Sequence, residues 1–513
     1  MRALLSVWDK TGLLDFARGL ASLEIELVAS GGTARTLGEA GIAHLDVAEV
    51  TGFPEMLDGR VKTLHPRIHG GILASRSEPS HLAALSAHDI VPIDLVVCNL
   101  YPFTSDPSIE LIDVGGPTMV RAAAKNHHHV GVVTSPDQYG VVLEELRASG
   151  QLSNATRHEL ARAAFAHTAA YDAEIVAWMD AGGAIGPVPD ARDEIVPPSL
   201  HLTLERANVV RYGENPHQIG ARYRVAGTSP WWDGVVQQAG SPLSYLNLFD
   251  ADAAWRLVHE LLDDAPGRRA VAIIKHANAS GAAVADTLHD AFAKALDADP
   301  QSAFGGIVAV AGQLDLELAT LIAAGPQADV VIAASMTDDA VATLVARRKA
   351  TRLLSAPSPE PLGRSIRTFG NTALVQNADE LLVPVADWRC VTDHLPTPEQ
   401  LVDLALAWRV CARTTSNAIV LARGGVAVGI GAGQQSRVVA ADIATAKAGD
   451  KAVGAAASSD AFFPFADGLD ALTRAGVTSV VQPGGSVRDQ EVIEAANAAN
   501  IVMMLTGERH FRH

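Results

Sequence analysis

The chain has 513 residues, a length that predicts about three or four domains' worth of polypeptide. Hydrophobic residues make up 48% and charged residues 19%, which provides for a large core and excludes a disordered chain. The formal net charge of −18 argues against general nucleic-acid binding, which needs a basic face. An anionic substrate must therefore be bound by a local cluster of basic residues, which opposes the negative electrostatic potential of the protein as a whole.

The cysteine content and the apolar runs indicate the compartment. Cys98, Cys390 and Cys411 include no close pair, so neither a disulfide framework nor a CxxC redox or zinc site is expected. The first residues lack the apolar stretch of a signal peptide, and no apolar run approaches the ~18 residues of a membrane span. We therefore expect a cytoplasmic protein with no membrane contact.

Proline and glycine divide the chain. Residues 182–198 read GGAIGPVPDARDEIVPP, which breaks helices and strands and stays solvated. We expect domains at 1–185 and 201–513, joined by a linker at 186–200. A second Pro-rich stretch, SAPSPEPLGR at 355–364, predicts a connector near 355–395 within the C-terminal part. No repeat of fixed period is apparent.

The N-terminal part alternates strand-like and helix-like segments. Strands are predicted at 4–7, 26–29, 93–98 and 130–134, and an amphipathic helical face at 13–20 follows the first of them. This order favours a parallel α/β sheet with ligands at the carboxyl ends of its strands.

The C-terminal part is also of the mixed α/β type. Thr397 and Gln400 predict a capped helix start, and Arg423-Gly424-Gly425 predicts a tight turn. Strands are predicted at 271–274, 307–310, 330–333, 419–421 and 426–430.

Two glycine loops of the N-terminal part precede predicted helices. Ser30–Thr33 offers free backbone N–H groups to a phosphate, although an ordinary strand–helix turn explains it equally well. Asp113–Thr118 is the second loop, and Arg121 and Lys125 share one face of the helix that follows. The pair suits an anionic ligand, or else it is a surface helix with like charges.

Other polar segments of this part have weaker signals. Asp9–Gly12 contains a K-T-G tripeptide that we attribute to chance, and Arg60–Pro66 is rich in donors for an anion but is also compatible with a solvated loop. His127–His129 gives a low expectation of metal, because consecutive residues do not converge on one point.

Four segments of the C-terminal part carry chemistry-bearing residues. Lys275-His276 ends a predicted strand, where the imidazole can act as a base and the amine can stabilise an oxyanion, although a structural histidine is the commoner outcome. Arg211-Tyr212 offers a phosphate ligand and a stacking ring. Gly429–Arg437 reads GIGAGQQSR, which is not a dinucleotide fingerprint. Ser458–Phe465 offers phenylalanines either to the core or to a flat heterocycle.

Together these segments resemble one family along nearly the whole chain. It is the bifunctional purine-biosynthesis family that combines phosphoribosylaminoimidazolecarboxamide formyltransferase with inosine monophosphate (IMP) cyclohydrolase. The matching strings, in chain order, are DKTG, SGGTA, TGFPEML, GRVKTLHP, CNLYPF, DVGG, RAAAKNH, RYGENPHQ, KHAN, TTSNA, GIGAGQQSR, SSDAFFPF and PGGS.

The resemblance implies an α/β protein with a methylglyoxal-synthase-like N-terminal domain that carries the cyclohydrolase. Two cytidine-deaminase-like subdomains would carry the formyltransferase. It also implies a homodimer, small-molecule substrates (the aminoimidazole carboxamide ribotide AICAR, its formylated product FAICAR and folate) and 10-formyltetrahydrofolate as co-substrate. No catalytic metal is implied, since the zinc signature of deaminases is missing, whereas a structural monovalent cation is allowed.

For formyl transfer the resemblance implies His276 as base and Lys275 as oxyanion stabiliser, with Asn417 orienting the formyl group or the base. The positions that match ribotide-binding residues are Arg211, Tyr212, Gly305, Asp329, Arg437 and Arg509. The positions that match folate-binding residues are Val438, Phe462, Asp467, Ser486 and Val487.

For cyclisation the resemblance implies Lys125 as proton-transfer residue and adds Lys62 to the catalytic set. The nucleotide contacts fall at Asp9, Lys10, Ser30, Gly31, Gly32, Thr33, Arg60, Lys62, Thr63, Cys98, Asn99, Tyr101, Asp113 and Val114.

This sequence departs from the family pattern at Trp8, where a small polar residue is common, and at Ala279-Ser280, where many bacterial members have Pro-Cys. The match around Asp329 is loose. Two alternatives stay open: a deaminase relative that acts on a nucleotide, and an N-terminal domain that senses a metabolite. The missing metal ligands count against the first, and Lys125 beside two glycine loops counts against the second.

Overall fold

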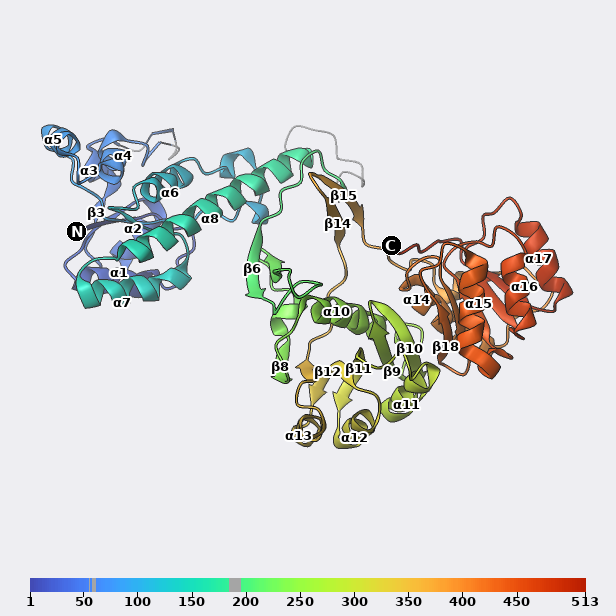
Figure 1. Ribbon diagram of the computed structural model, residues 1–513. Coiled ribbons are helices and arrows are strands. Elements are labelled where there is room, and N and C mark those ends of the chain that lie inside the picture. The colour runs from blue at the N-terminus through green and yellow to red at the C-terminus, as the bar shows by residue number, and fades with distance from the viewer. Residues whose placement is uncertain (55, 58–60, 184–194) are drawn as a thin grey trace. The chain divides into compact units, whose positions relative to one another are not determined.

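The computed structural model describes residues 1–54, 56–57, 61–183 and 195–513 (Figure 1). The chain forms two compact units, one of Met1–Thr203 with Thr368–Gln376 and one of Leu204–Arg367 with Asn377–His513. Most of the expected linker, residues 186–194, lies outside the described residues, and residues 195–200 group with the first unit.

The first unit contains a five-stranded sheet in the order β3-β2-β1-β4-β5, and all of its neighbours pair in parallel. The parallel α/β sheet predicted from the sequence is thus confirmed. The central strands are almost fully buried, as expected when helices cover both faces of a sheet. The strands are β1 (Arg2–Leu5), β2 (Glu26–Ala29), β3 (Leu45–Asp46), β4 (Leu95–Val97) and β5 (Gly131–Val133).

The helices of this unit connect successive strands. The predicted face at 13–20 lies on α1, whose Leu13, Phe16, Ala17 and Leu20 are buried. The helices are α1 (Leu13–Ser22), α2 (Gly31–Glu39), α3 (Val47–Thr51), α4 (Pro66–Leu73), α5 (Pro79–Ala87), α6 (Gly115–Lys125), α7 (Tyr139–Ser149) and α8 (Asn154–Asp180).

The second unit contains two six-stranded sheets, and the first has the order β10-β9-β11-β12-β13-β8. Helix α10 covers one face of this sheet, while α11, α12 and α13 lie on the other (Figure 1). The elements are β6 (Leu204–Val209), β7 (Ala221–Val225), β8 (Val236–Ala239), α10 (Tyr245–Glu260), β9 (Arg269–Lys275), β10 (Asn278–Ala285), α11 (Leu288–Ala298), β11 (Gly306–Leu314), α12 (Leu316–Ala324), β12 (Ala328–Met336), α13 (Asp338–Arg347) and β13 (Arg352–Ser355).

The second sheet has the order β16-β21-β20-β19-β17-β18. Its helix α14 begins at the predicted capping box of Thr397 and Gln400, and the predicted turn at Arg423–Gly425 joins β17 to β18. The elements are β16 (Arg389–Cys390), α14 (Pro398–Ala412), β17 (Ile419–Ala422), β18 (Ala427–Gly431), α15 (Arg437–Ala448), β19 (Ala456–Ser459), α16 (Asp467–Arg474), β20 (Ser479–Gln482), α17 (Asp489–Ala498) and β21 (Val502–Leu505).

The two sheets repeat one topology. In each, a helix leads to an antiparallel hairpin (β9–β10 or β17–β18), an antiparallel neighbour (β11 or β19) and two further parallel strands. The two hairpins meet at a bridge between Ala283 and Val426, where the Val284 N–H donates to the Gly425 carbonyl at 2.9 Å. The repetition is structural, since the sequence shows no fixed period.

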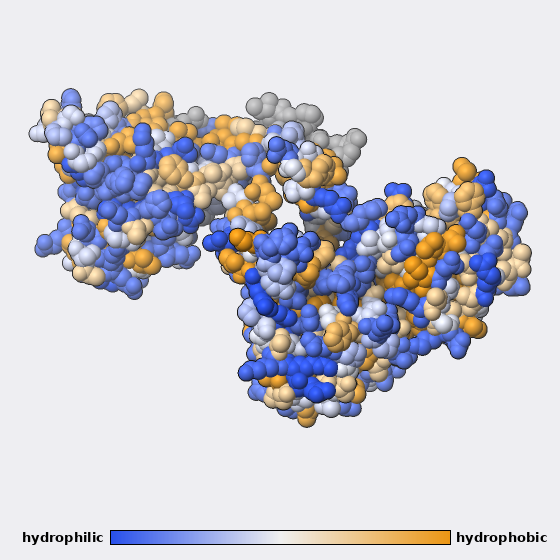
Figure 2. Space-filling model, in the orientation of Figure 1, coloured by the Kyte–Doolittle hydropathy of each residue, from blue (hydrophilic) through white to orange (hydrophobic). Residues whose placement is uncertain are grey.

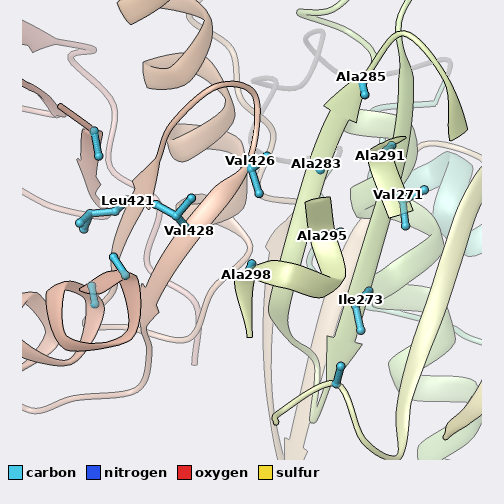
Figure 3. Packing of buried hydrophobic residues seen from close by; sticks show 14 of the residues in the cluster. Val271, Ile273, Ala283, Ala285, Ala291, Ala295, Ala298, Leu421, Val426 and Val428 are labelled. Atoms are coloured by element: carbon cyan, nitrogen blue, oxygen red, sulfur yellow. The ribbon is translucent and has the colours of Figure 1, made fainter. Parts of the chain in front are cut away.

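Alternation along the strands supplies two separate cores. On β9, Val271 and Ile273 join a cluster that continues to Leu421 and Val428 of the second sheet (Figure 3). The intervening Ala272 and Ile274 face the other way, toward α10. Period-two alternation between two apolar layers explains why this strand reads as a continuous hydrophobic run.

The expected connector near 355–395 contains a β-hairpin that the sequence analysis did not predict. Its strands are β14 (Arg364–Phe369) and β15 (Thr372–Asn377), paired with each other in a two-stranded sheet. The face seen in Figure 2 is largely hydrophilic with smaller apolar patches. Among the described residues, no helix is both long and apolar enough to cross a bilayer.

Candidate active sites

The first candidate site lies at the carboxyl edge of the parallel sheet, where the loops after β1, β2 and β4 meet. Asn99 follows β4, and its side-chain oxygen accepts from the N–H groups of Trp8 and Asp9 at 2.7 and 2.9 Å. Thr33 follows β2, and its hydroxyl accepts from the Val7 N–H at 2.9 Å. Three loops distant in sequence are thereby locked together beside the N-terminus of α2.

Two amines lie beside the glycine loop that opens α2. Gly31 has a φ of +51°, and a Cβ there would lie 3.1 Å from the Lys62 Nζ. A Cβ on Gly32 would lie 3.7 Å from the Lys10 Nζ. Backbone N–H groups of a helix start and two cations therefore converge, which suits a phosphate. The predicted contact Arg60 lies outside the described residues.

Asp113 brings the second glycine loop to the same edge. Its carboxylate accepts from the Gly116 N–H at 2.9 Å, and its own N–H donates to the Tyr171 hydroxyl at 2.7 Å. Burial raises the pKa of Asp113 above its usual range, although the N–H groups of Gly116 and Gly115 oppose the rise. A Cβ on Gly115 would lie 2.9 Å from the Thr63 hydroxyl, so the loop containing Lys62 packs directly against this one.

The remaining nucleotide-contact candidates line this edge differently. Cys98 is 2% exposed, and burial raises the pKa of its thiol, so it presents no thiolate. Trp8 and Tyr101 form an edge-to-face pair with centroids 5.2 Å apart, so the unusual tryptophan borders the site and remains half exposed. Val114 is exposed, whereas Ser30 is buried with its hydroxyl 3.0 Å from that of Ser6.

Lys125 lies at the opposite end of α6 from the glycine loop. It is the last residue of the helix, and ten helical steps of 1.5 Å separate its backbone from Gly115 by about 15 Å. Arg121 shares its exposed face, with the guanidinium 5.6 Å from the Phe165 ring. The structure thus gathers Lys62 and Asp113, and the role of Lys125 stays a prediction. His127 and His128 stack on each other, and no metal-binding group is found among the described residues.

The second candidate site is built from facing edges of the two sheets in the second unit. Because β9 and β11 are antiparallel and β11 and β12 parallel, the end of β9 and the starts of β11 and β12 share one edge. That edge carries Lys275, His276, Gly305 and Asp329. By the same reasoning, the start of β17 and the ends of β18, β19, β20 and β21 share an edge. It carries Asn417, Arg437, Val438, Phe462, Asp467, Ser486, Val487 and Arg509.

His276 and Ala277 form the two-residue turn between β9 and β10. His276 is exposed, and the Lys275 amine donates to the Phe304 carbonyl at 2.8 Å. The side-chain oxygen of Asn278 accepts from the Thr415 N–H at 2.8 Å, which ties the turn to the loop that carries Asn417. The turn that carries the imidazole, directly after Lys275, is therefore bonded to that loop.

Arg437 holds Asn417 from the other side. Its guanidinium donates to the Asn417 side-chain oxygen at 2.8 Å and to the carboxylate of the fully buried Asp460. The Asn417 side-chain amide donates to the Gln434 carbonyl at 2.9 Å. The amide of Asn417 is thus fixed by Arg437 and the Gln434 carbonyl, and both terminal nitrogens of the Arg437 guanidinium are bonded within the protein.

The other predicted ligands are more exposed. The Arg211 guanidinium lies 5.4 Å from the Tyr212 ring, and that of Arg509 lies 4.4 Å from the Phe511 ring. Of the three phenylalanines in SSDAFFPF, Phe463 is core, while Phe462 and Phe465 are 37% and 47% exposed. The core alternative therefore holds for Phe463, and the platform alternative stays a prediction for Phe462 and Phe465.

The basic C-terminal tail docks onto this same unit. Arg512 donates to the carbonyls of Ala277 and Arg413, and its N–H donates to the Ser416 hydroxyl at 3.1 Å. His510 is 2% exposed and contacts Asp379 through Nδ1 at 2.8 Å.

Sequence reasoning assigned no role to the groups that support the site. Asp250 accepts from the N–H groups of both His276 and Ala277, and Asp460, Asn278 and Arg512 complete the network. One sequence signal could have found Asp250: it is a carboxylate among the apolar residues of Leu248–Ala254, at a position that the helix buries. A buried carboxylate needs hydrogen-bond partners, so such a residue indicates a structural or functional contact.

Comparison with known proteins gives two family matches that overlap along the chain. Residues 12–134 match the MGS-like domain, which defines the first unit as methylglyoxal-synthase-like. Residues 123–447, more than half of the chain, match the AICARFT/IMPCHase bienzyme model, so the chain belongs to that family. A solved structure described as the crystal structure of ForH is 39% identical, covers 34% of this chain and 97% of its own, and has a TM-score of 0.32.

Membership of this family defines the activity. The protein is a bifunctional enzyme that combines AICAR formyltransferase with IMP cyclohydrolase, the last two steps of purine biosynthesis. AICAR is formylated to FAICAR, and the ring of FAICAR closes to give IMP.

Proposed function

We propose that the first unit performs the cyclisation and the second the formyl transfer, with 10-formyltetrahydrofolate as formyl donor. Two hydrogen bonds carry the second assignment. Asn278, which bonds the His276 carbonyl, accepts from the Thr415 N–H in the loop that leads to Asn417, and Arg437 donates to the Asn417 side chain. The first assignment rests on the amines of Lys10 and Lys62 beside the α2 glycine loop.

Formyl transfer needs a base because the ribotide amine shares its lone pair with the ring and the carboxamide. The amine nitrogen attacks the formyl carbon, and His276 takes the proton that the nitrogen releases. The ammonium of Lys275, which already donates to Phe304, has further N–H groups for the oxyanion of the tetrahedral intermediate. The bond to the folate nitrogen then breaks, and that nitrogen receives a proton. Asn417 orients the formyl oxygen or the imidazole.

Cyclisation joins two groups of one molecule, so positioning supplies much of its rate. The carboxamide nitrogen attacks the new formyl carbon, and the resulting carbinol loses water. Lys10 and Lys62 hold the ribotide phosphate or a developing negative charge, and Asp113 orients the base edge. Lys125 is the proposed proton-transfer residue and Lys62 its companion.

The proposal extends to the remaining ligands and to assembly. Arg211, Tyr212, Gly305, Asp329, Arg437 and Arg509 bind the ribotide, while Val438, Phe462, Asp467, Ser486 and Val487 bind folate. The exposed Phe462 ring suits the flat pterin. We place the enzyme in the cytoplasm as a homodimer, on the strength of the family resemblance.

Separation of the two activities tests these assignments in the full chain. His276→Ala should abolish formyl transfer from 10-formyltetrahydrofolate to AICAR while leaving cyclisation of supplied FAICAR intact. Lys62→Ala should show the converse. Loss of both activities in either folded variant would overturn the assignment to separate units. Retention of formyl transfer by His276→Ala would remove this residue from the site.

A further inference from the structure

The turn that carries His276 has an unusual backbone. Lys275 and Asn278 pair as the last and first residues of β9 and β10, which leaves His276 and Ala277 as the whole loop. Their φ angles are +54° and +56°. Two-residue hairpin loops with both φ angles positive normally use Asn and Gly, because a Cβ disfavours this region. Some interaction must hold His and Ala there.

A buried carboxylate supplies that interaction. Asp250 of α10 is 8% exposed and accepts from the His276 N–H at 3.2 Å and the Ala277 N–H at 2.9 Å. Burial raises the pKa of Asp250, and the two N–H groups, His276 and Arg512 oppose the rise. The buried carboxylate therefore carries a cost in desolvation, which its two hydrogen bonds to the turn offset.

The carbonyls of the turn are held from the opposite side. The Asn278 side-chain amide donates to the His276 carbonyl at 3.0 Å, and Arg512 donates to the Ala277 carbonyl at 3.0 Å. All four backbone polar groups of the two-residue turn thus have side-chain partners. Arg512 also exchanges hydrogen bonds with Ser416 at 2.9 and 3.1 Å, so the turn is tied to the residue before Asn417.

The second half of the unit contains a matched counterpart. Asp403 occupies the sixth position of α14, as Asp250 does in α10, and accepts from the N–H groups of Gly424 and Gly425 at 2.9 and 2.8 Å. The φ angles there are +61° and +77°. The fold therefore uses a carboxylate for both hairpins, but glycines fill the turn that carries no candidate catalytic residue. Of these two turns, only the one that contains His276 places residues with a Cβ at positive φ, which suggests that the strain there serves a function.

We propose that Asp250 is a positioning residue for formyl transfer, which acts by holding the left-handed His276–Ala277 turn and with it the imidazole. The inference rests on the proposed role of His276 as base. Without the carboxylate, the turn relaxes toward negative φ and carries the imidazole away from the attacking amine. Misplacement of a catalytic group by about 1 Å costs on the order of 100-fold in rate.

The test compares Asp250→Ala with Asp403→Ala in the full-length enzyme. Asp250→Ala should lower kcat for formyl transfer by about 100-fold, with KM for both substrates changed by less than about threefold and cyclisation unchanged. Asp403→Ala removes the same two bonds from the matched turn, and its kcat should stay within about threefold of wild type. Equal losses in the two variants would show a general structural effect and overturn the proposal.

A second substitution distinguishes turn geometry from direct contact with substrate. Glycine adopts positive φ without a clamp, so Ala277→Gly in the Asp250→Ala background should recover about tenfold in kcat. No recovery would overturn the proposal. Where Asp250→Ala does not fold, Asp250→Asn keeps one acceptor and should lose about tenfold. A folded Asp250→Asn enzyme with wild-type kcat would equally overturn it.

His276→Ala, assayed in parallel, separates this inference from the site assignment. If His276→Ala loses formyl transfer but Asp250→Ala retains wild-type kcat, only the positioning role of Asp250 falls. If His276→Ala retains formyl transfer, the assigned base and the inference built on it fall together.

Discussion

The guanidinium of Arg437 donates to the side-chain oxygen of Asn417 at 2.8 Å, which joins the first turn of α15 to the loop before β17. The same guanidinium pairs with Asp460, which is fully buried. The arrangement needs a planar group with donors in two directions. Lysine carries the charge but has no such fork.

Arg437→Lys should therefore lower kcat/KM for formyl transfer by about 100-fold, since Asn417 loses its orienting partner while Asp460 keeps a cation. Steady-state kinetics with AICAR and the formyl donor measure the effect. Lys447→Ala is the control. Lys447 lies on the same helix as Arg437, but its ion pair with Asp299 is partly exposed. Wild-type kcat/KM in Arg437→Lys would show that Asn417 does not depend on this contact.

Gly31→Ala should impair cyclisation. The φ of +51° makes any Cβ costly, by about 1–2 kcal/mol, and this Cβ would also approach the Lys62 amine at 3.1 Å. We expect kcat/KM for FAICAR to fall by about tenfold or more, with formyl transfer unchanged. Gly41→Ala has the same kind of strain at φ +68° with no atom within 4 Å, so it should lose stability alone. Equal cyclisation kinetics in the two variants would contradict a role for the amine.

Sequence patterns anticipated the loops of both sites because each loop follows a strand and uses glycine, a cap or a cation. Ser30–Thr33 follows β2, and Lys275-His276 ends β9, as the apolar runs predicted. Local patterns specify such features, since the residues that make them are adjacent in the chain.

Long-range partners could not be predicted in this way. Asp250 precedes His276 by 26 positions, and Arg512 lies 235 positions from Ala277. Their contacts follow from the order and direction of strands in two sheets, which apolar periodicity does not determine. The hairpin of β14 and β15 was missed for a related reason: its residues are largely exposed, so no alternation of apolar and polar residues marks it.

Asp113→Asn should stabilise the protein near neutral pH while it weakens cyclisation. Burial raises the pKa of Asp113, so the folded state binds its proton more tightly than the unfolded chain, and the ionised carboxylate costs stability above the raised pKa. Asparagine removes that cost and still accepts from Gly116. The gain should disappear as the pH falls to the ordinary range of aspartate, where the wild-type carboxyl is protonated.

Thermal unfolding at about pH 7 and about pH 4, with kcat/KM for FAICAR, checks this. We expect the unfolding midpoint of Asp113→Asn to exceed that of the wild type at about pH 7 and to equal it at about pH 4. We also expect kcat/KM for FAICAR to fall by about tenfold or more, because a charged acceptor is gone. Asp137→Asn, at an exposed position of the same unit, should change neither. A lower midpoint for Asp113→Asn at neutral pH would contradict the expected sign.

His510→Gln should destabilise the second unit in a manner that depends on pH. His510 is 2% exposed, and its ring nitrogens lie 2.8 Å from Asp379 and 3.3 Å from Glu508. Burial opposes the charged ring, but the two carboxylates outweigh burial and raise the pKa of His510 above its ordinary 6.5. The resulting stabilisation is fully present below pH 6.5 and is lost as the pH rises through the raised value.

Unfolding midpoints of wild type and His510→Gln at about pH 6 and about pH 9 measure this contribution. The difference between the two proteins should be larger at the lower pH, because only there does protonation of His510 favour the folded state. His394→Gln provides the control, since His394 is exposed in the same unit and should show no such change. A difference of equal size at both pH values would mean that His510 stabilises the tail through packing against Trp408, 5.3 Å away between ring centroids, and not through its charge.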